Sequence, residues 1–264
     1  MTARELRAKV AAVPFWWHSI DVGFGVTTLG IRRPRDLARQ LASLQLPDLH
    51  GKTVLDIGAW DGFFSFAAEE RGAARVVACD RFVWALDRDA KNEYRSACRS
   101  DGIPLQPFDR VPHLWRFDEL PGKRGFDLAH AARSSRVEPL VADYMTMRVD
   151  AAGQFDVVLY LGVLYHMEDP LAAVRRVREL TKEVAIIETE AIVLGGFEHT
   201  ALSEFFPLGD KLCDDPTNFW APNASCLIGL CETAGFTRVE VLTTPPSAGR
   251  GRLARYRLVA HARV

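Results

Sequence analysis

The chain has 264 residues, of which 48% are hydrophobic and 25% charged, a composition typical of globular proteins. This length fits one larger domain, or one domain with an appended cap. The formal net charge of −1, from 33 basic and 34 acidic residues, gives no global attraction to nucleic acid or to an acidic membrane.

Apolar runs and cysteines narrow the choice of compartment. No apolar run approaches the roughly 18 residues that a membrane-spanning helix needs. Residues 1–20 lack the continuous apolar core and cleavage site of a signal peptide. The five cysteines include no CxxC pair, so a reduced, cytoplasmic protein without a zinc site is the simplest interpretation. The sequence leaves the oligomeric state open.

Residues 1–50 are predicted to form a helical and aromatic N-terminal extension. Residues 1–14 alternate charged with small apolar residues, which predicts a short amphipathic helix. The stretch FWWHSIDVGFGVTTLG (15–30) is aromatic and then glycine-rich, a composition unusual for a plain linker. Residues 33–46 place leucines at helical spacing and begin with a proline near the first turn, which predicts a second helix.

Strands alternate with helices in the predicted main domain, residues 51–264. The expected strands are 53–58, 75–79, 137–143, 155–162, 183–191, 238–244 and 254–264, and the expected helices are 62–71, 125–135, 170–181 and 224–235. Such alternation implies parallel pairing and a doubly wound α/β sheet, and the two closing strands fit a last strand that runs antiparallel. Residues 81–124 depart from this rhythm and are interpreted as an insertion over the site.

The stretch VLDIGAWDGFFSF (54–66) reads as a buried strand, a glycine turn and a helix, the usual place for a cofactor loop. Gly58 and Gly62 are present, but Trp60 and Asp61 fill the space where a dinucleotide loop has its middle glycine. A carboxylate there would repel a pyrophosphate and suit a cation. S-adenosylmethionine (SAM) carries a sulfonium and an ammonium but no phosphate.

Two later strand ends also carry acids. Asp80 is placed to accept hydrogen bonds from both ribose hydroxyls. Asp143, followed by Tyr144, stands where an acid can accept from an adenine amino group. Acids at three strand ends without a phosphate cradle predict SAM as the cofactor. Other interpretations stay open. Asp80 and Asp143 are alternatively solvated residues at strand ends without a role in binding. Trp60 is either a core residue or a wall for the methionine moiety.

Several segments resemble the class I SAM-dependent methyltransferases: VLDIGAWDGFFSF, VVACD (76–80) and FDVVLYLGVLYHMEDPLAAV (155–174). GVLYHMEDPL (162–171) and NFWAPNASCLIGLCETAGF (218–236) resemble the CmoB-like group, which includes tRNA wobble-uridine carboxymethyltransferases. The resemblance implies a Rossmann-like, seven-stranded methyltransferase sheet. It also implies SAM contacts at Asp56, Gly58, Asp61, Gly62 and Asp80. The full predicted cofactor-binding set adds Trp60, Asp143, Tyr144 and Leu161.

The chain departs from the tRNA enzymes of this group just before the first strand. The tRNA enzymes carry a Trp-Lys-Trp-rich stretch before the first strand and use a carboxylated SAM. In this chain LQLPDLHGK (44–52) stands at that place. Ordinary methyl transfer therefore fits better than carboxymethyl transfer to tRNA.

Methyl transfer is an in-line displacement, and a hydroxyl acceptor must lose its proton to a base. His166, after strand 155–162, is either that base or a histidine that caps the next helix, and Tyr165 beside it shapes the pocket. His18 is a second candidate base under an aromatic lid, or an incidental residue of a docked helix. Glu188 and Glu190 close strand 183–191, and one of them is expected to bind an acceptor hydroxyl or amine while the other points away. Glu190 is the one included in the candidate catalytic set.

A metal is not predicted. His166, Glu168 and Asp169 lie within four residues, but acids at that position are more typical of a helix N-terminus, where they favour the helix dipole.

Residues 81–124 and 192–223 are expected to build the acceptor pocket. They are rich in aromatic residues, among them Trp84, Trp115 and Phe117, which suits a small organic molecule or a sugar. Aromatics beside arginines also suit RNA bases, but the near-neutral charge favours the small molecule. The predicted function is a small-molecule O-methyltransferase. The alternatives are a tRNA-modifying enzyme of the same fold and a SAM-binding scaffold without catalysis.

Overall fold

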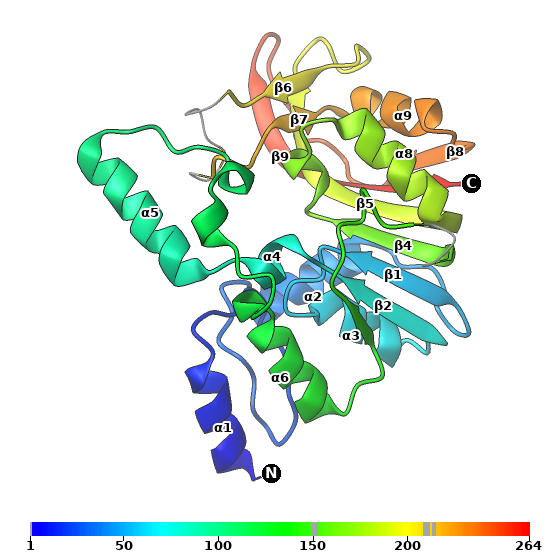
Figure 1. Ribbon diagram of the computed structural model, residues 1–264. Coiled ribbons are helices and arrows are strands. Elements are labelled where there is room, and N and C mark those ends of the chain that lie inside the picture. Colours follow the sequence, from blue (N-terminus) through cyan, green and yellow to red (C-terminus); the bar gives the residue numbers. More distant parts are fainter. Residues whose placement is uncertain (1, 149–152, 208–211, 213–214) are drawn as a thin grey trace. The chain divides into compact units, whose positions relative to one another are not determined.

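The apolar runs of the sequence form a seven-stranded sheet with strand order β3-β2-β1-β4-β5-β9-β8 (Figure 1). The computed structural model describes residues 2–148, 153–207, 212 and 215–264. The strands of this sheet are β1 (Thr53–Ile57), β2 (Arg75–Cys79), β3 (Glu138–Leu140), β4 (Phe155–Leu161), β5 (Thr181–Leu194), β8 (Arg238–Val241) and β9 (Leu253–Arg263). A separate antiparallel pair joins β6 (Ser203–Phe205) to β7 (Trp220–Pro222). The chain divides into two compact units, which we describe in turn.

Unit 1 comprises residues 1–88 and 115–146 and holds β1, β2 and β3. These strands pair in parallel, with Leu55 opposite Val77 and Val77 opposite Glu138. Four of the five residues of β1 and of β2 are buried, as expected for parallel strands covered on both faces. The helices of this unit are α1 (Ala3–Ala12), α2 (Pro34–Ser43), α3 (Phe63–Glu70), α4 (Phe82–Ala85) and α6 (Arg124–Arg133).

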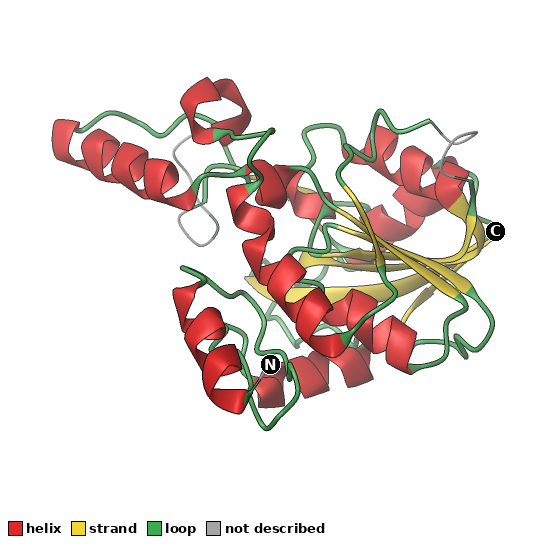
Figure 2. Cartoon of the chain, turned by 60° about the horizontal axis from the view of Figure 1, so that its bottom comes forward, coloured by secondary structure: helices red, strands yellow, loops and turns green. Residues whose placement is uncertain are grey.

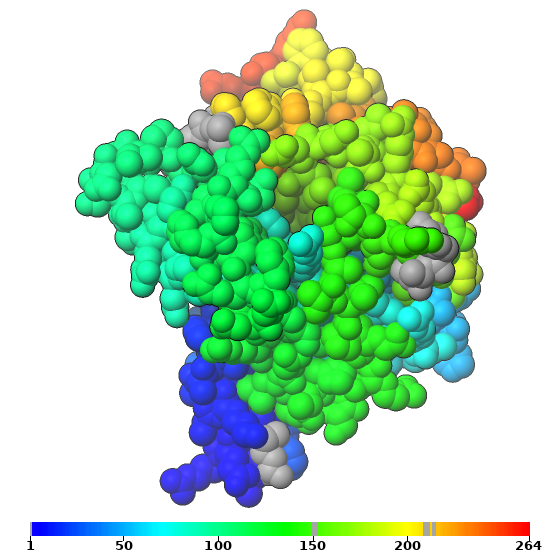
Figure 3. Space-filling view, in the orientation of Figure 1, coloured from blue at the N-terminus to red at the C-terminus, as the bar shows by residue number. Residues whose placement is uncertain are grey.

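Local sequence explains where these helices begin. Thr2 and Glu5 form a capping box at the start of α1, which satisfies two of its free backbone N–H groups. Pro34 occupies the first position of α2, where its missing N–H costs nothing. In the space-filling view α1, coloured blue, packs at the surface beside the green α6 (Figure 3). The N-terminal extension is thus ordered against the rest of its own unit.

Unit 2 comprises residues 89–114 and 147–264 and holds the remaining strands. β4 and β5 are parallel, whereas β9 runs antiparallel to both of its neighbours, β5 and β8. The helices α8 (Pro170–Leu180) and α9 (Ala224–Thr233) pack on each other and on this part of the sheet (Figure 2). The Asp169 carboxylate caps α8 by accepting from the Ala172 N–H at 2.9 Å.

The predicted fold class is confirmed. The structure has the doubly wound α/β sheet, the antiparallel last strand and the helical N-terminal extension. None of the helices in the described ranges is long and apolar enough to cross a membrane.

The segment 81–124 differs from the expectation in its detail. It contains α4, the longer helix α5 (Arg88–Asp101) and the short turns η1 (Phe108–Arg110), η2 (Pro112–Leu114) and η3 (Pro121–Lys123). The sequence did not indicate α5 because most of its residues are polar, with Cys98 as its buried residue. Its apolar face is narrow, made by small or partly polar residues such as Ala90, Tyr94 and Cys98, so the periodic signal is weak.

Candidate active site

The loop after β1 is shaped by two glycines in the left-handed region. Gly58 has φ 78° and Gly62 has φ 88°. The Gly58 N–H donates to the Cys79 carbonyl at 2.8 Å, which ties the loop to the end of β2. A Cβ on Gly62 would lie 2.8 Å from ring atoms of both Phe66 and Phe126. Both the backbone angle and the tight packing therefore require glycine at position 62.

The backbone of Trp60, in the loop after β1, bonds residues that follow β2. Its φ of 52° is unusual for a residue other than glycine. Its N–H donates to Asp80 Oδ2 at 3.0 Å, and its carbonyl accepts from Trp84 Nε1 at 2.6 Å. Its indole stacks on Trp17, with ring centroids 4.7 Å apart and planes 10° from parallel. Trp60 therefore connects the loop to the aromatic segment 15–30, which we call the leader.

Asp61 anchors the leader. Its Oδ2 accepts the backbone N–H groups of Trp17 and His18, both at 2.8 Å, and its Oδ1 pairs with His18 Nδ1. The His18 ring packs against Phe63 and Phe64 and is 6% exposed. The sequence suggested a carboxylate facing a cation of the cofactor. In the structure both oxygens of Asp61 are engaged by the leader instead.

Asp56 and Asp80 are buried carboxylates at the ends of β1 and β2. Ser65 Oγ donates to Asp56 Oδ2 at 2.6 Å, and the Val83 N–H donates to Asp80 Oδ1 at 2.9 Å. Burial raises the pKa of Asp56 and that of Asp80 to about 6 each. Asp80 Oδ2 accepts the Trp60 N–H, and Asp80 Oδ1 accepts the Val83 N–H. Each carboxylate oxygen can accept two hydrogen bonds. Asp80 therefore retains the capacity to accept from ribose hydroxyls, which fits SAM.

Asp143 and Tyr144 follow β3. The Asp143 Oδ1 accepts the Met145 N–H at 2.9 Å, which closes a tight turn through the Asp143 side chain. Tyr144 is buried, and Asp143 is partly exposed. Asp143 belongs to the same unit as the residues of the loop after β1.

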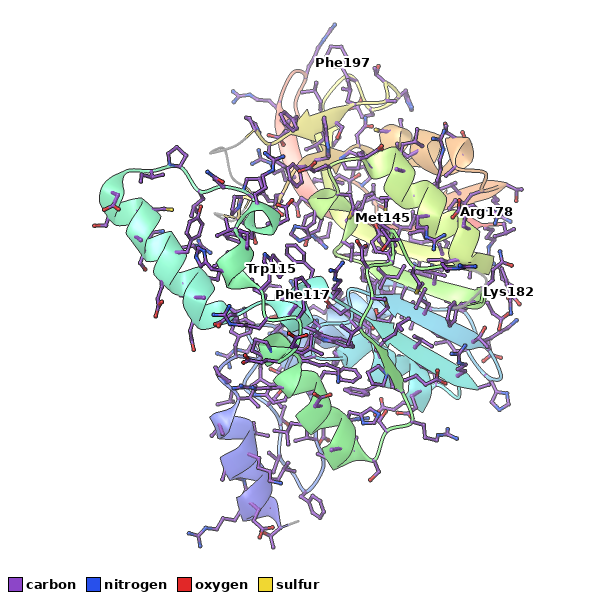
Figure 4. All side chains as sticks on the ribbon, in the orientation of Figure 1. Trp115, Phe117, Met145, Arg178, Lys182 and Phe197 are labelled. Atoms are coloured by element: carbon purple, nitrogen blue, oxygen red, sulfur yellow. The ribbon has the colours of Figure 1, made fainter. Side chains whose placement is uncertain are left out.

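The aromatic residues of 81–124 within unit 1 have two different environments. Trp84 is fully buried and belongs to the core, which differs from its expected place in an acceptor pocket. Phe82 and Phe117 are exposed, and Trp115 packs between them, with ring centroids 4.5 Å from Phe82 and 6.1 Å from Phe117 (Figure 4). The guanidinium of Arg81 lies 4.6 Å from the centroid of Phe117.

The turn after β4 brings the acceptor candidates of unit 2 together. Leu161 ends β4, and Gly162 follows with φ 73° and donates its N–H to the Glu188 carbonyl at 2.8 Å. The turn η4 (Leu164–His166) then carries Tyr165 and His166. A Cβ on Gly162 would lie 3.4 Å from the Tyr165 hydroxyl, so the backbone approaches this ring closely.

A charged cluster lies beside Tyr165. Arg257 on β9 donates through Nε to Glu188 Oε1 at 2.5 Å and through Nη2 to the other oxygen of the same carboxylate. Its Nη1 lies 3.4 Å from Glu190 Oε2, and its guanidinium lies 5.0 Å from the Tyr165 ring centroid. Burial raises the pKa of Tyr165 and that of Glu190, and Arg257 opposes both shifts. Both Glu188 and Glu190 contact Arg257, so the expectation that one of them points away is wrong, because residues two apart on a strand lie on the same face. The cluster offers acids, a guanidinium and a phenol for hydrogen bonding.

His166 is held through one ring nitrogen. Its Nδ1 lies 2.9 Å from the Thr217 carbonyl oxygen and 3.0 Å from Thr217 Oγ1. A carbonyl only accepts, so in the neutral ring Nδ1 carries the proton and Nε2 the lone pair. Burial lowers the pKa of His166, and the Asp215 charge opposes that shift. The geometry therefore presents a neutral imidazole that can take a proton at Nε2.

The acids next to His166 have other partners. Glu168 pairs with Arg110 at 3.6 Å, and Asp169 caps α8. Within the described ranges no three metal-ligating side chains gather into a possible metal site.

Sequence reasoning missed three residues of unit 2: Thr217, Asp215 and Arg257. No motif marks them, because each acts through a partner that is distant in the sequence. Arg257 stands opposite Glu190 in the β5–β9 register, so only the strand pairing reveals it.

Residues 29–241 match a family model described as a methyltransferase domain. The chain belongs to this methyltransferase family. The cofactor of the methyltransferase is SAM, and the acidic strand ends and the glycine loop of unit 1 suit it.

Curated relatives carry the name tRNA U34 carboxymethyltransferase. The protein of Desulfotalea psychrophila is 27% identical over 245 residues, which cover 92% of this methyltransferase and 62% of the relative. That of Helicobacter pylori strain Shi470 is 31% identical over 207 residues, which cover 75% and 62%. The methyltransferase thus spans about three fifths of the length of these relatives.

Solved structures with the same fold include the N-terminal domain of EvdMO1 with S-adenosylhomocysteine (SAH) bound. Its TM-score is 0.61 at 16% identity, and the match covers 100% of the methyltransferase and 97% of that domain. The same domain in the presence of SAH and D-fucose matches with a TM-score of 0.59 and the same coverage. A putative SAM-dependent methyltransferase from Listeria monocytogenes has a TM-score of 0.51 at 16% identity, with 86% and 99% covered.

Proposed function

We propose that this methyltransferase transfers a methyl group from SAM to a hydroxyl of a small polar acceptor such as a sugar, with His166 as the general base. The observation that carries the proposal is the imidazole of His166. Its Nδ1–H is committed to Thr217, and Nε2 makes no hydrogen bond to any residue in the described ranges. A base needs an accessible lone pair within reach of the acceptor hydroxyl.

His18, the other candidate base, fits a structural role better. Its ring is 6% exposed and lies against two phenylalanines, whereas His166 is partly exposed. Its Nδ1 and its backbone N–H both bond Asp61. We assign His18 to the attachment of the leader over the loop.

The polar cluster of unit 2 supports a hydroxyl-rich acceptor. Carboxylates accept hydrogen bonds from vicinal hydroxyls, a guanidinium donates to them, and an aromatic ring packs against the apolar face of a sugar. Glu188, Glu190 and Arg257 with Tyr165 make up this set. The EvdMO1 domain, which has the same fold, was crystallised in the presence of D-fucose. We therefore propose that Tyr165 and Glu190 bind the acceptor while His166 takes its proton.

The predicted SAM residues belong to unit 1, apart from Leu161. When bound, SAM supplies an electrophilic methyl group. We propose that Asp80 accepts from the ribose hydroxyls, that Asp143 and Tyr144 bind the adenine, and that the loop around Gly58 lies along the methionine moiety. The remaining members of the proposed set are Asp56, Trp60, Gly62 and Leu161, and Asp61 is left out of it because both its carboxylate oxygens bond residues 17 and 18. In doubly wound sheets ligands bind at the carboxyl ends of parallel strands, and the loop after β1 follows such an end.

Methyl transfer to a tRNA wobble uridine is the second candidate, and the names of the curated relatives favour a tRNA acceptor. One observation weighs against it. The formal net charge is −1, which gives little attraction to a polyanion.

The test is a transfer assay with methyl-tritiated SAM. The full chain is incubated with a panel of hexoses and deoxyhexoses, with their nucleotide-linked forms, and in parallel with unmodified tRNA transcripts. We expect label in a sugar fraction, with the methylated hydroxyl located by mass spectrometry. Label in tRNA and none in any sugar would favour the tRNA function instead. Binding of SAH in calorimetry together with no label in any sugar or tRNA would favour the SAM-binding scaffold without catalysis.

A further inference from the structure

The segment 215–220 is fastened to the turn that carries His166. The Phe219 N–H donates to the Tyr165 carbonyl at 2.8 Å, and Trp220 Nε1 donates to the Glu168 carbonyl at 3.1 Å. The His166 imidazole makes the third connection, through Thr217. Thr217 is 8% exposed, so its hydroxyl exchanges little with solvent. The environment of Nδ1 is therefore fixed by the protein.

The hydrogen bonds around Thr217 run in one direction. Asp215 Oδ1 accepts from Thr217 Oγ1 at 2.7 Å and from the Thr217 N–H at 3.0 Å. A carboxylate only accepts, so the hydroxyl hydrogen points toward Asp215. The lone pairs of Oγ1 then face His166 Nδ1 at 3.0 Å. Asp215, Thr217 and His166 therefore form a chain in which the hydroxyl donates to Asp215, while the His166 Nδ1–H faces two acceptors, the Thr217 carbonyl and Thr217 Oγ1.

We infer that Asp215 and Thr217 are positioning residues for His166: they hold the imidazole as the Nδ1–H tautomer and make Nε2 a stronger base. This inference rests on the proposed role of His166 in methyl transfer. A buried carboxylate that orients a histidine through its Nδ1–H is the arrangement of hydrolase triads, and here a threonine hydroxyl stands between the two. The structure thus gives a role to two residues that no sequence motif marks.

The charges around His166 determine in which direction each of them shifts its pKa. Burial lowers the pKa of His166, Asp215 raises it, and Arg257 and Lys91 lower it. The pKa of Asp215 is itself low, because Lys91 and His166 oppose the effect of its burial, so the carboxylate is charged. Removal of the Asp215 charge should therefore make His166 a weaker base.

The experiment is a nitrogen-15 NMR titration of the imidazoles in the full chain, with His166 assigned by its loss in His166→Asn. We expect the neutral wild-type ring to be protonated at Nδ1 and not at Nε2. In Asp215→Asn the pKa of His166 should fall by roughly half a unit to one unit, because a nearby negative charge is lost. In Thr217→Val the shift should be smaller, because the charge remains and only the hydroxyl connection is lost.

Two further variants separate positioning from a general loss of structure. Thr217→Ser keeps the hydroxyl and should titrate like the wild type. Ser225→Ala removes a comparable side-chain hydrogen bond, 2.8 Å to the Glu198 carbonyl, and should leave the titration of His166 unchanged. A neutral ring protonated at Nε2 in the wild type would overturn the inference. The same pKa for His166 in Asp215→Asn and in the wild type would also overturn it.

The titration needs no acceptor, so its outcome is distinct from that of the proposed function. The Nδ1–H tautomer together with a lowered pKa in Asp215→Asn supports the positioning role whatever the acceptor is. If the transfer assay labels no hydroxyl compound, the proposed reaction fails while this result stands.

Discussion

Two histidines of this methyltransferase are held by acids through Nδ1, and the contrast between them is instructive. In unit 1, His18 pairs directly with Asp61, and the same carboxylate also accepts two backbone N–H groups. In unit 2, His166 reaches Asp215 through the hydroxyl of Thr217. The first ring is buried between phenylalanines, and the second is partly exposed.

The difference lies in what each acid stabilises. Asp61 accepts the backbone N–H groups of residues 17 and 18, so its pairing with His18 fixes the chain path of these residues over the loop. Asp215 orients a hydroxyl, which orients a ring whose second nitrogen stays accessible. The same two residue types thus fasten a structural segment in one place and prepare a base in the other.

The largest expected effect on stability is that of Asp61→Asn. This change leaves buried N–H groups of the leader without a charged acceptor and separates His18 from its partner. We expect a loss of about 2–4 kcal/mol in the free energy of unfolding, together with faster proteolysis near residues 15–30. Urea unfolding followed by circular dichroism measures the first, and limited trypsin digestion the second.

Asp36→Asn is the matched control for this experiment. Asp36 is exposed and lies 3.7 Å from Arg39 on the same helix, so its loss should change stability by less than about 1 kcal/mol. Equal effects of the two substitutions would contradict the anchoring role of Asp61.

Asp80→Ala should weaken cofactor binding in unit 1. The ribose hydroxyls lose a charged acceptor, so we expect the Kd for SAH to rise by several-fold to about a hundred-fold, or roughly 1–3 kcal/mol. Isothermal titration calorimetry measures this change. Glu138→Ala, on the exposed edge strand β3 and paired with Arg75, is the control and should leave the Kd unchanged. An unaltered Kd in Asp80→Ala would mean that the ribose binds elsewhere.

The smallest expected effect is a pH dependence of SAH binding. Burial raises the pKa of Asp80 to about 6, so its carboxylate is ionised above that pH and protonated below it. A protonated carboxyl loses acceptor capacity, so the affinity for SAH should fall several-fold between about pH 7.5 and about pH 5. Asp80→Asn should flatten this dependence. A wild-type affinity that is constant over the whole range would contradict the assignment.

The sequence predicts the fold well because its signals are local. Apolar runs such as TVLDI and FDVVLYL mark the parallel strands, and the glycine turn that ends at Gly62 marks the start of α3. Helix α5 escaped prediction because its residues are mostly polar, and β5 extends to Leu194 because its pairing with β9 continues past the predicted end.

The site was predictable in its residue types and less so in its partners. His18, Asp61 and His166 stand out in the sequence as candidates. That His18 and Asp61 pair with each other does not, since they are 43 residues apart. Thr217 and Asp215 lie 51 and 49 residues after His166, in a segment whose path depends on tertiary hydrogen bonds. Residue identity is readable from sequence patterns, whereas pairing requires the folded chain.

The most direct test of the account is the single-turnover rate of labelled methyl transfer from bound SAM to the identified hydroxyl acceptor, compared for His166→Asn and His18→Asn. We predict that His166→Asn lowers the rate by about 10²–10⁴-fold, the usual contribution of a general base, while His18→Asn lowers it far less. Thermal unfolding of both variants confirms that each is folded. A His166→Asn enzyme that transfers the methyl group at the wild-type rate would contradict the central claim.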